Sequence, residues 1–441
     1  MMRISRRDGW LYYLTGIIVS LLLISGLIYI LTGDIEKAEP EEPGQKSDGM
    51  EAEKGRRKKY DKIRVVIMTG GFEHIVHNQA EFEAENGLVI TYGDETKEYA
   101  GGETFRMEPD SEMFQDGTVI ISAKEANDKI TISSLKRGYG EPYYRGTLEL
   151  YTTAEGIVIV NELPLEEYLY AVVPSEMPAS YEQEALKVQA VCARSYAYCQ
   201  MEDLGYPEYD AHVDDSVSYQ VYGNSEENET TVAAVDDTKG EKLVYNGNVV
   251  KAYYFSTSCG TTTGIDAWGT EESEDNAYLQ SVEVSSEDGY YEEDLAWFQW
   301  EAVIPEKTMS NLVGLNAGKD IGTLVSLEVT ERGSGGIALK VTAKGTKGRV
   351  TVETENKIRT FLGGSGYRIT KTDNTVVDSG KLLPSAFITI TKKDGNYMIR
   401  GGGYGHGIGM SQNGANEMAK QGMKYEEILK LFYQEVEIAA Q

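Results

Sequence analysis

The sequence predicts an α+β protein. We expect a β-rich, multi-part ectodomain with one long buried helix and a C-terminal helix, behind an N-terminal transmembrane helix. Three observations carry this prediction. Residues 10–32 form an uncharged, mostly apolar run. Short β-branched runs separated by Gly, Asp and Asn recur from residue 62 onward, as in strands joined by turns. Residues 180–203 carry apolar side chains at helical spacing.

The first segment of interest is the apolar run from Trp10 to Thr32, which is long enough to cross a bilayer as a helix. Arginines precede it and acidic residues follow it, so the positive-inside rule keeps residues 1–9 in the cytoplasm and places the chain after it outside the cell. A cleaved signal peptide is the alternative. Its apolar region would be shorter, and no small-x-small cleavage site is present.

The next segments are a linker and a small domain. Residues 33–60 are rich in Glu, Lys, Gly and Pro, a composition typical of a solvated tether. From Lys62 the runs KIRVVIMT, GLVITYG, TVIISA and KITISSL read as strands. We therefore expect a small β-rich domain over residues 61–140.

The remainder, residues 141–441, is expected to be the main domain. Its long helix places Ala185, Val188 and Cys192 on one face and should be mostly buried scaffold. A variable insertion is expected around 270–380, and a terminal helix from about residue 411 to Phe432.

Composition narrows the class of protein. The net charge of −29 argues against a nucleic-acid partner, because phosphate binding needs a basic face. The 30 tyrosines against 9 phenylalanines suit carbohydrate contact, although a β-rich fold alone also explains them. Three cysteines give no disulfide framework. Cys192 and Cys199 lie two helical turns apart, about 10 Å, which is too far for a bridge.

The strongest catalytic candidate is Glu176, within VVPSEMP. Pro174 and Pro178 flank it, so we expect a restricted, non-helical backbone here. Its neighbours are apolar, and desolvation of a carboxyl raises its pKa. A carboxylic acid that stays protonated at neutral pH can donate a proton to a glycosidic oxygen. The alternative is a structural glutamate that accepts backbone N–H bonds at a helix start.

The sequence around Glu176 does not indicate a second catalytic carboxylate. The nearby glutamates lie on expected strand ends or helix faces, where they are solvated. A glycosidase of the usual kind needs two carboxylates at a fixed separation. If this chain cleaves glycan, the sequence therefore favours a mechanism with a single acid.

A glycine-rich loop, GGGYGHGIGMSQNGA, spans Gly401 to Ala415 and carries His406, one of four histidines in the chain. Glycine permits positive φ and close approach to a ligand. A tight structural turn before a helix is the alternative. A second hydroxyl-rich segment, FSTSCGTTTG, carries Ser256 and Ser258.

Two rival chemistries use these segments. Ser256 or Ser258 with His406 as base would give a nucleophilic serine, but STSCG is not a G-x-S-x-G elbow. Zinc is conceivable through His212, Cys259 and His406, but the spacing matches no standard metal signature. We expect no metal and no cofactor.

Four ordered blocks resemble the stage II sporulation protein D (SpoIID/LytB) family. They are YRGTLEL through NELPLEEYLYAVVPSEMPASYEQEALKVQAVCARSYAY, then SVSYQVYG, then FSTSCGTTTG, and finally LPSAF with GGGYGHGIGMSQNGANEMAKQGMKYEEILKLFY. The resemblance covers roughly residues 143–436, with gaps around 270–320. The region 61–140 and the anchor are only loosely covered.

This resemblance implies a peptidoglycan lytic transglycosylase in which Glu176 is the catalytic acid. The product would be a 1,6-anhydro-N-acetylmuramic acid end, in cell-wall remodelling and, as the family name suggests, sporulation. A second branch of the family enhances cell-wall amidases, so the alternative is a non-catalytic, wall-binding activator of an amidase. Some members bind zinc, but their ligand set does not match here.

The resemblance also implies which residues contact the polymer. The matching positions would line the cleft as substrate-binding residues: Arg194, Tyr196, Tyr219, Gln220, Ser256, Ser258, His406, Ser411 and Gln412. Of these, Arg194 could equally be a structural ion-pair partner on its helix. The implied partners are glycan strands, the membrane through one N-terminal helix, and an amidase. Together with the charges that flank the apolar run, this predicts a location at the cell membrane, with residues 34–441 outside.

Overall fold

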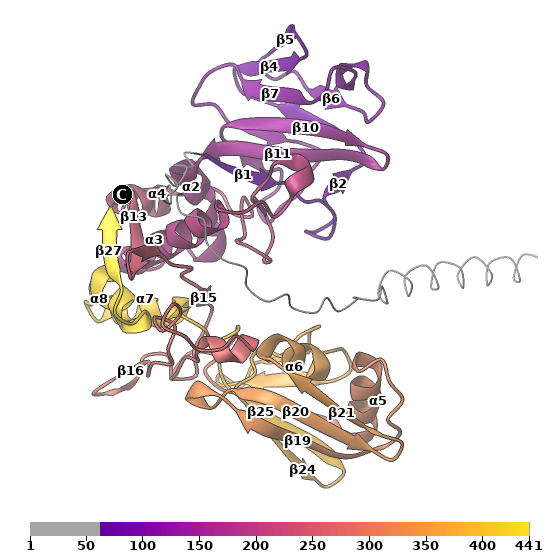
Figure 1. Cartoon of the computed structure of the whole chain (residues 1–441), viewed down its shortest axis with the longest axis vertical. Helices are drawn as coiled ribbons and strands as arrows, with labels where there is room; N and C mark the ends of the chain where they lie inside the picture. Colours follow the sequence, from indigo (N-terminus) through magenta and orange to yellow (C-terminus); the bar gives the residue numbers. More distant parts are fainter. Residues whose placement is uncertain (1–61, 441) are drawn as a thin grey trace, which may run out of the picture. The chain divides into compact units, whose positions relative to one another are not determined.

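The computed structural model describes residues 62–440 of the chain (Figure 1). The predicted cytoplasmic segment 1–9, the transmembrane anchor 10–32 and the linker 33–60 lie outside the described residues. Within the described range, no helix combines the length and apolarity needed to cross a bilayer. The predicted α+β class is confirmed: several sheets and seven α-helices make up this part of the chain.

An eight-stranded sheet forms the first half of the fold, and Figure 1 shows its strands side by side in indigo and magenta. Its spatial order is β12-β1-β11-β10-β7-β4-β5, with β2 also paired to β11. The strand bounds are β1 Lys62–Val66, β2 Val76–His77, β4 Gly87–Tyr92, β5 Glu95–Ala100, β7 Val119–Ala123, β10 Thr147–Thr153, β11 Gly156–Pro164 and β12 Val213–Asp214. A four-stranded sheet, β6-β3-β8-β9, packs beside it; its bounds are β3 Ala80–Glu83, β6 Phe105–Met107, β8 Ile130–Ile132 and β9 Tyr143–Tyr144.

The expected domain boundary at residues 140 and 141 falls inside this sheet. β10 pairs with β7 and β11 pairs with β1, and both pairings cross that boundary. The alternating burial of β10 explains the pairing, because Leu148 and Leu150 are fully buried against the core. The division into separate folding units stays a prediction.

Three helices pack together against this half: α2 Leu165–Glu176, α3 Gln183–Gln200 and α4 Glu229–Asp237. α3 is the predicted long helix. It is buried on almost every side, since Leu186, Ala190 and Val191 are as buried as the predicted face. Its small residues let α2 and α4 approach closely, which makes it the scaffold on which the other elements rest.

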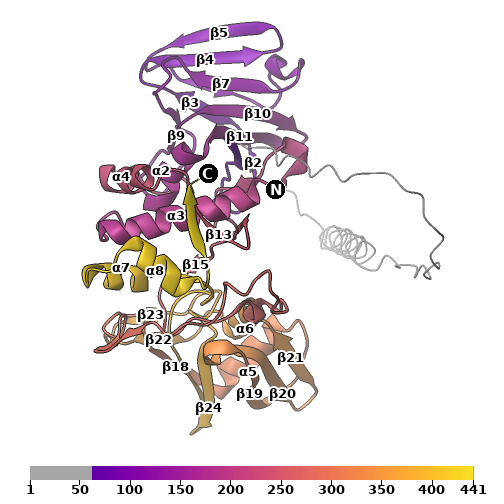
Figure 2. The same cartoon turned by 60° about the vertical axis from the view of Figure 1, so that its left-hand side comes forward.

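The segment 300–401 forms a five-stranded sheet, β23-β22-β18-β25-β24, and a three-stranded sheet, β19-β20-β21. Figure 2 shows α5 and α6 beside the second of these sheets. The bounds are β18 Trp300–Pro305, α5 Glu306–Asn316, β19 Leu324–Arg332, β20 Ala338–Gly345, β21 Arg349–Glu353, α6 Glu355–Leu362, β22 Arg368–Lys371, β23 Val376–Asp378, β24 Ile388–Lys393 and β25 Asn396–Gly401. The expected insertion at 270–380 is therefore folded structure with its own buried side chains, such as Ile337 and Phe361.

The chain then returns to the first half. β25 leads into the glycine-rich loop, then into β26 Met410–Ser411, which pairs in parallel with β15 Tyr254–Phe255. The predicted single terminal helix is two helices, α7 Gln412–Lys420 and α8 Tyr425–Phe432. Gly422 at φ 91° separates them, a left-handed conformation that ends a helix. The last strand, β27 Glu437–Ala440, pairs with β13 Glu241–Tyr245, which also pairs with β14 Asn248–Val249.

Candidate functional site

A pocket of about 510 Å³ opens where α2, β15, the glycine-rich loop and α6 meet. Six of the predicted site residues line it: Glu176, Tyr196, Tyr219, Ser256, His406 and Gln412. The other lining residues are Val217, Ser218, Val221, Tyr253, Tyr254, Phe255, Trp268, Arg359, Tyr404 and Gly405. Aromatic rings and hydroxyl groups dominate this wall, a lining that suits a ring-shaped polar ligand such as a sugar.

Glu176 is the last residue of α2. The expectation of a non-helical backbone was wrong, because Pro174 sits in the final turn, where its fixed φ is compatible with the helix. Ser175 supports this end: its Oγ donates to Ala171 O at 2.6 Å and accepts from the backbone N–H of Asn224 at 3.0 Å. The helix end and the 221–225 loop are thereby fixed to each other beside the pocket.

As a whole residue Glu176 is partly buried, and Val221 N–H donates to its carboxyl Oε1 at 2.7 Å. Desolvation raises the pKa of Glu176 to about 7, although Val221, Tyr254 and Gln412 partly oppose the rise by hydrogen bonding. The group therefore keeps a proton near neutral pH. That is the condition for a general acid.

Gln412 connects Glu176 to α7. Its Nε2 donates to the Glu176 backbone oxygen at 3.1 Å and to Gln189 Oε1 at 3.2 Å. The parallel pairing of β15 with β26 places Tyr254 opposite Met410 and Phe255 opposite Ser411, directly before Gln412. This pairing brings the hydroxyl-rich segment and the start of α7 to one side of the pocket.

The glycine-rich loop wraps against β15. Gly405 and Gly409 adopt φ of 120° and 75°, and a Cβ at either would clash with Phe255 or with the Tyr253 carbonyl. His406 holds the loop: its Nε2 donates to Tyr254 O at 2.9 Å, and its Nδ1 accepts from Ile408 N–H at 3.1 Å.

The two hydrogen bonds of His406 define a neutral imidazole with the proton on Nε2. Burial, assisted by Arg359, lowers the pKa of His406 to about 4. Both ring nitrogens are thus engaged with the backbone, and Ser256 Oγ contacts Thr257 Oγ1 at 3.1 Å instead. The serine–histidine arrangement weighed from the sequence is not formed.

Four predicted substrate-binding residues lie outside the pocket, and Arg194 is the clearest case. It is fully buried on α3 and forms a two-pronged ion pair with Glu166 of α2, at 2.8 and 2.7 Å. It also donates to the carbonyls of Val235 and Glu241 at 3.1 Å each. Arg194 therefore has the structural role that the sequence left open as an alternative, because its guanidinium is hydrogen-bonded to other groups of the protein.

Gln220 lies one layer behind the pocket wall. Its Nε2 donates to Tyr254 Oη at 3.0 Å, so it orients a lining residue rather than lining the pocket itself. Ser258 and Ser411 are also buried, and both donate hydroxyl hydrogen bonds to the Glu292 carboxylate. Ser411 Oγ additionally accepts from Gly414 N–H at 3.2 Å, which caps α7. Ser258, Glu292 and Ser411 thereby connect the hydroxyl-rich segment to the start of α7.

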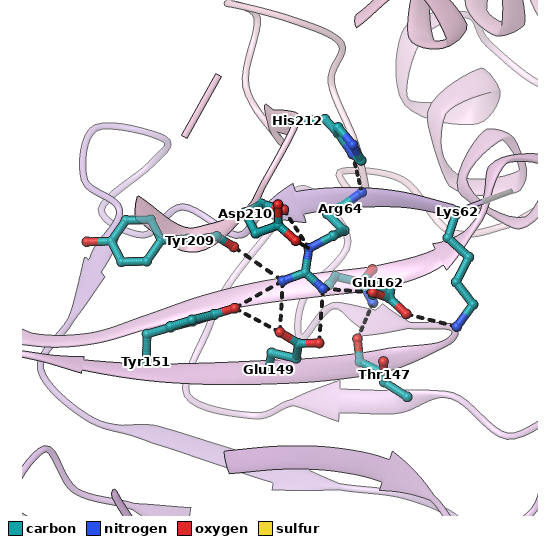
Figure 3. Close-up of polar contacts among 10 residues, drawn as sticks. Lys62, Arg64, Thr147, Glu149, Tyr151, Glu162, Tyr209, Asp210 and His212 are labelled. Carbon is teal, nitrogen blue, oxygen red and sulfur yellow. Dashed lines mark hydrogen bonds and ion pairs between the residues drawn. The ribbon is translucent and has the colours of Figure 1, made fainter. Parts of the chain in front are cut away.

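The residues weighed as a zinc set are spread apart. His212 Nδ1 accepts from Arg64 N–H at 3.0 Å, within a cluster where Arg64 pairs with Glu149 and Glu162 on the large sheet (Figure 3). His406 lies at the pocket. Cys259 lies neither in the Arg64 cluster nor at the pocket of Glu176, and burial raises the pKa of its thiol to about 11. Within residues 62–440, no group of three or more His, Cys, Asp or Glu side chains could hold a metal ion.

Several pocket residues were missed by the sequence reasoning. Tyr404 lies within the quoted glycine-rich loop and Tyr254 directly precedes the quoted hydroxyl-rich segment, so their tyrosine character was a usable signal. Trp268 packs on His406 with ring centroids 5.1 Å apart. Arg359 comes from α6, where its Nη1 donates to Glu355 at 2.7 Å. Nothing in the local sequence marks Trp268 or Arg359, since only the packing of segment 300–401 brings α6 to the pocket.

The fold and pocket define a mixed α+β protein with a desolvated carboxyl in an aromatic pocket. Residues 153–245 match the family described as "Stage II sporulation protein", and residues 248–409 match one described as a domain of unknown function. Stage II sporulation protein D of Bacillus amyloliquefaciens is 32% identical over 294 residues, covering 64% of this chain and 75% of that protein. The chain therefore belongs to the stage II sporulation protein D family.

Two further relatives bear on function. An uncharacterized protein of Brachyspira hyodysenteriae is 32% identical over 328 residues, covering 74% of this chain and 77% of that protein. The amidase enhancer of Bacillus subtilis is 31% identical over 290 residues, covering 60% of this chain. The match spans only 39% of the amidase enhancer's own length.

Proposed function

We propose that this protein is a peptidoglycan lytic transglycosylase with Glu176 as its catalytic acid and base. The observation that carries the proposal is a carboxyl with a pKa raised to about 7 in a pocket lined by aromatic rings and hydroxyl groups. Membership of the stage II sporulation protein D family also supports the proposal, because the sequence resemblance to that family implies this activity.

Glu176 is the only carboxylate among the described residues that line the pocket. Hydrolysis by the usual two-carboxylate route needs a second Asp or Glu about 5–10 Å from the first, to attack or to activate water. The buried Glu292 does not supply it, because its oxygens accept from Ser258 and Ser411 beneath the pocket wall. The geometry therefore favours a reaction that needs no activated water.

The proposed chemistry uses one carboxyl twice. Protonated Glu176 gives its proton to the oxygen between N-acetylmuramic acid and N-acetylglucosamine, and the bond from C1 to that oxygen breaks. The carboxylate then takes the proton of the 6-hydroxyl of the same muramoyl residue, whose oxygen bonds to C1. The products are a free 4-hydroxyl and a 1,6-anhydro end, with no water consumed.

Two groups position this acid. Val221 N–H holds one carboxyl oxygen, and Gln412 ties the adjacent backbone to α7. Arg359 places a cation on the pocket wall, where it favours an electron-rich ligand oxygen.

The second candidate is a wall-binding activator of a cell-wall amidase. The similarity to the amidase enhancer of Bacillus subtilis favours it. In that case the pocket would bind glycan without cutting it. Under either proposal the protein acts outside the membrane, held by the apolar run 10–32, and its partners are glycan strands and, for the second proposal, the amidase.

The test is mass spectrometry of soluble fragments after the purified full-length protein is incubated with peptidoglycan, both intact and stripped of stem peptides. We expect 1,6-anhydro-muramoyl ends from the wild type and a loss of about 100-fold or more in Glu176→Gln, because general acid catalysis is worth that much. Glu167→Gln, a change at a partly exposed glutamate of the same helix that does not line the pocket, is the matched control.

Each outcome decides between the candidates. Products with reducing ends would mean hydrolysis and would contradict the single-acid proposal. An absence of products from both substrates, with glycan binding retained and added amidase stimulated, would establish the activator instead.

A further inference from the structure

A second cavity, of about 640 Å³, lies against the glycine-rich loop and the five-stranded sheet. Gly401 and Gly402 line this cavity, whereas Tyr404, Gly405 and His406 line the pocket of Glu176. One short loop therefore contributes to both hollows. The lining residues of the second cavity fall within the region matched only to a domain of unknown function.

The charge of this cavity is opposite to that of the whole chain. Arg332, Lys371 and Arg400 line it against one carboxylate, Glu301, although the chain carries a net charge of −29. Arg400 and Glu301 are paired across β25 and β18, and Arg400 Nε donates to Glu301 at 2.6 Å. The remaining two cations give the cavity a net positive charge.

Those two cations are fixed by neutral groups. The terminal nitrogens of Arg332 donate to the carbonyls of Gly336 and Ile388 at 2.8 Å each. Lys371 Nζ lies 5.0 Å from the centre of the Trp297 ring. Within residues 62–440, neither Arg332 nor Lys371 has a carboxylate within 4.0 Å. The cavity thus presents two positioned positive charges that no carboxylate contacts directly, an arrangement suited to an external anion.

An aromatic pair links the two hollows. Tyr404 lines the pocket of Glu176 and is 43% exposed, and its ring lies 4.9 Å from the ring of Trp297. Lys371, whose Nζ also contacts the Trp297 ring, lines the second cavity. A sugar that packs on the exposed face of Tyr404 would therefore present its substituents toward the cations.

We propose that the second cavity binds a carboxylate of the same polymer whose sugar occupies the pocket of Glu176. The proposal rests on the proposed function, because it takes peptidoglycan as the ligand. Two sources share this chemistry. The lactyl group of a muramoyl residue is a free carboxylate where the stem peptide has been removed, and the stem peptide carries carboxylates where it remains.

The test measures binding rather than cleavage. It uses the full-length chain carrying Glu176→Gln, so that the polymer is not consumed. The cavity variant adds Arg332→Gln and Lys371→Met, which remove the two cations without a carboxylate partner, and the matched control adds Arg368→Gln, an exposed arginine on the same strand as Lys371 that does not line the cavity. The probes are glycan strands without stem peptides, glycan strands with them, and uncharged chitin oligosaccharides.

We expect the cavity variant to bind at least one carboxylate-bearing probe about 10-fold to 100-fold more weakly, since loss of one or both charged hydrogen bonds weakens binding by roughly tenfold each. Chitin binding should be unchanged, and the difference should shrink at high salt. Selective loss with stripped glycan assigns the lactyl carboxylate, and selective loss with intact glycan assigns the stem peptide.

Equal affinity of the cavity variant and the control for both polymers would overturn the proposal, as would an equal loss for chitin. Failure of the proposed function is a separate result. In that case the wild type would release no anhydro products, while this binding comparison would still report on the cavity.

Discussion

At the scale of single residues, Glu176 and His406 show how burial sets protonation. Desolvation acts on both side chains and disfavours the charged form of each. It raises the pKa of Glu176 to about 7 and lowers the pKa of His406 to about 4. The first keeps a proton that it can transfer, and the second stays neutral and serves as a hydrogen-bonded brace for the loop.

This contrast predicts the pH profile of cleavage. In the proposed mechanism the cleavage step needs protonated Glu176, so kcat/KM should fall about tenfold per pH unit above pH 7. Titration of His406 should not change the cleavage rate between pH 5 and 7, because His406 is already neutral there. The measurement is the initial rate of release of anhydro ends from pH 5 to 9.

A rate that rises with pH through 7 would contradict the assignment of Glu176 as the acid. A limb near pH 6 that disappears in His406→Asn would show that His406 titrates in the reaction.

At the scale of elements, Arg194 joins three helices and a strand. It lies on α3, pairs with Glu166 on α2, and donates to carbonyls at the end of α4 and the start of β13. A buried charge with all its partners in place is strongly destabilising to disrupt, because the remaining charge is left without compensation. The helical layer that carries Glu176 depends on this contact.

We therefore predict that Arg194→Met lowers the free energy of unfolding by about 3–5 kcal/mol and leaves the KM for glycan unchanged. The measurement is urea unfolding together with steady-state cleavage. Lys187→Met is the matched control on the same helix, where a partly exposed ion pair with Asp237 at 3.1 Å contributes about 1 kcal/mol or less. A stable Arg194→Met protein with a raised KM would instead place this arginine in the substrate site.

At the scale of the whole molecule, buried acids oppose folding at high pH, and Glu176 and Glu292 are among them. Burial raises the pKa of both Glu176 and Glu292 from 4.5 to about 7. A group whose pKa is higher in the folded state contributes stability below its unfolded pKa and loses it as pH rises through the folded value. The window for this loss runs from about pH 4.5 to just above 7.

The prediction is that the free energy of unfolding falls between pH 5 and pH 8, by up to about 3 kcal/mol for each group. The high negative charge of the chain adds a general repulsion in the same direction. The informative quantity is therefore the difference between the wild type and Glu176→Gln/Glu292→Gln, obtained from urea unfolding at both pH values. The double variant should show the flatter dependence, and an equal slope would refute the prediction.

The sequence by itself determined the features that depend on local pattern. The α+β class followed from short β-branched runs and one helical period, and family membership followed from ordered motifs. The raised pKa expected for Glu176 agrees with the structure, but the groups that contact its carboxyl, Val221, Tyr254 and Gln412, come from distant parts of the chain rather than from its apolar sequence neighbours. The expectation of a non-helical backbone there was wrong, since a proline in the last turn of α2 removes one hydrogen bond without ending the helix earlier.

The tertiary structure decided which polar residues face the pocket and which face the protein. Arg194 turns to Glu166, and Ser258 and Ser411 turn to Glu292, whereas Arg359 arrives from α6 to line the pocket. These partners lie 28 to 119 residues apart in the sequence. A polar side chain is buried only where its hydrogen bonds are satisfied, and partners so distant are fixed by packing rather than by local sequence.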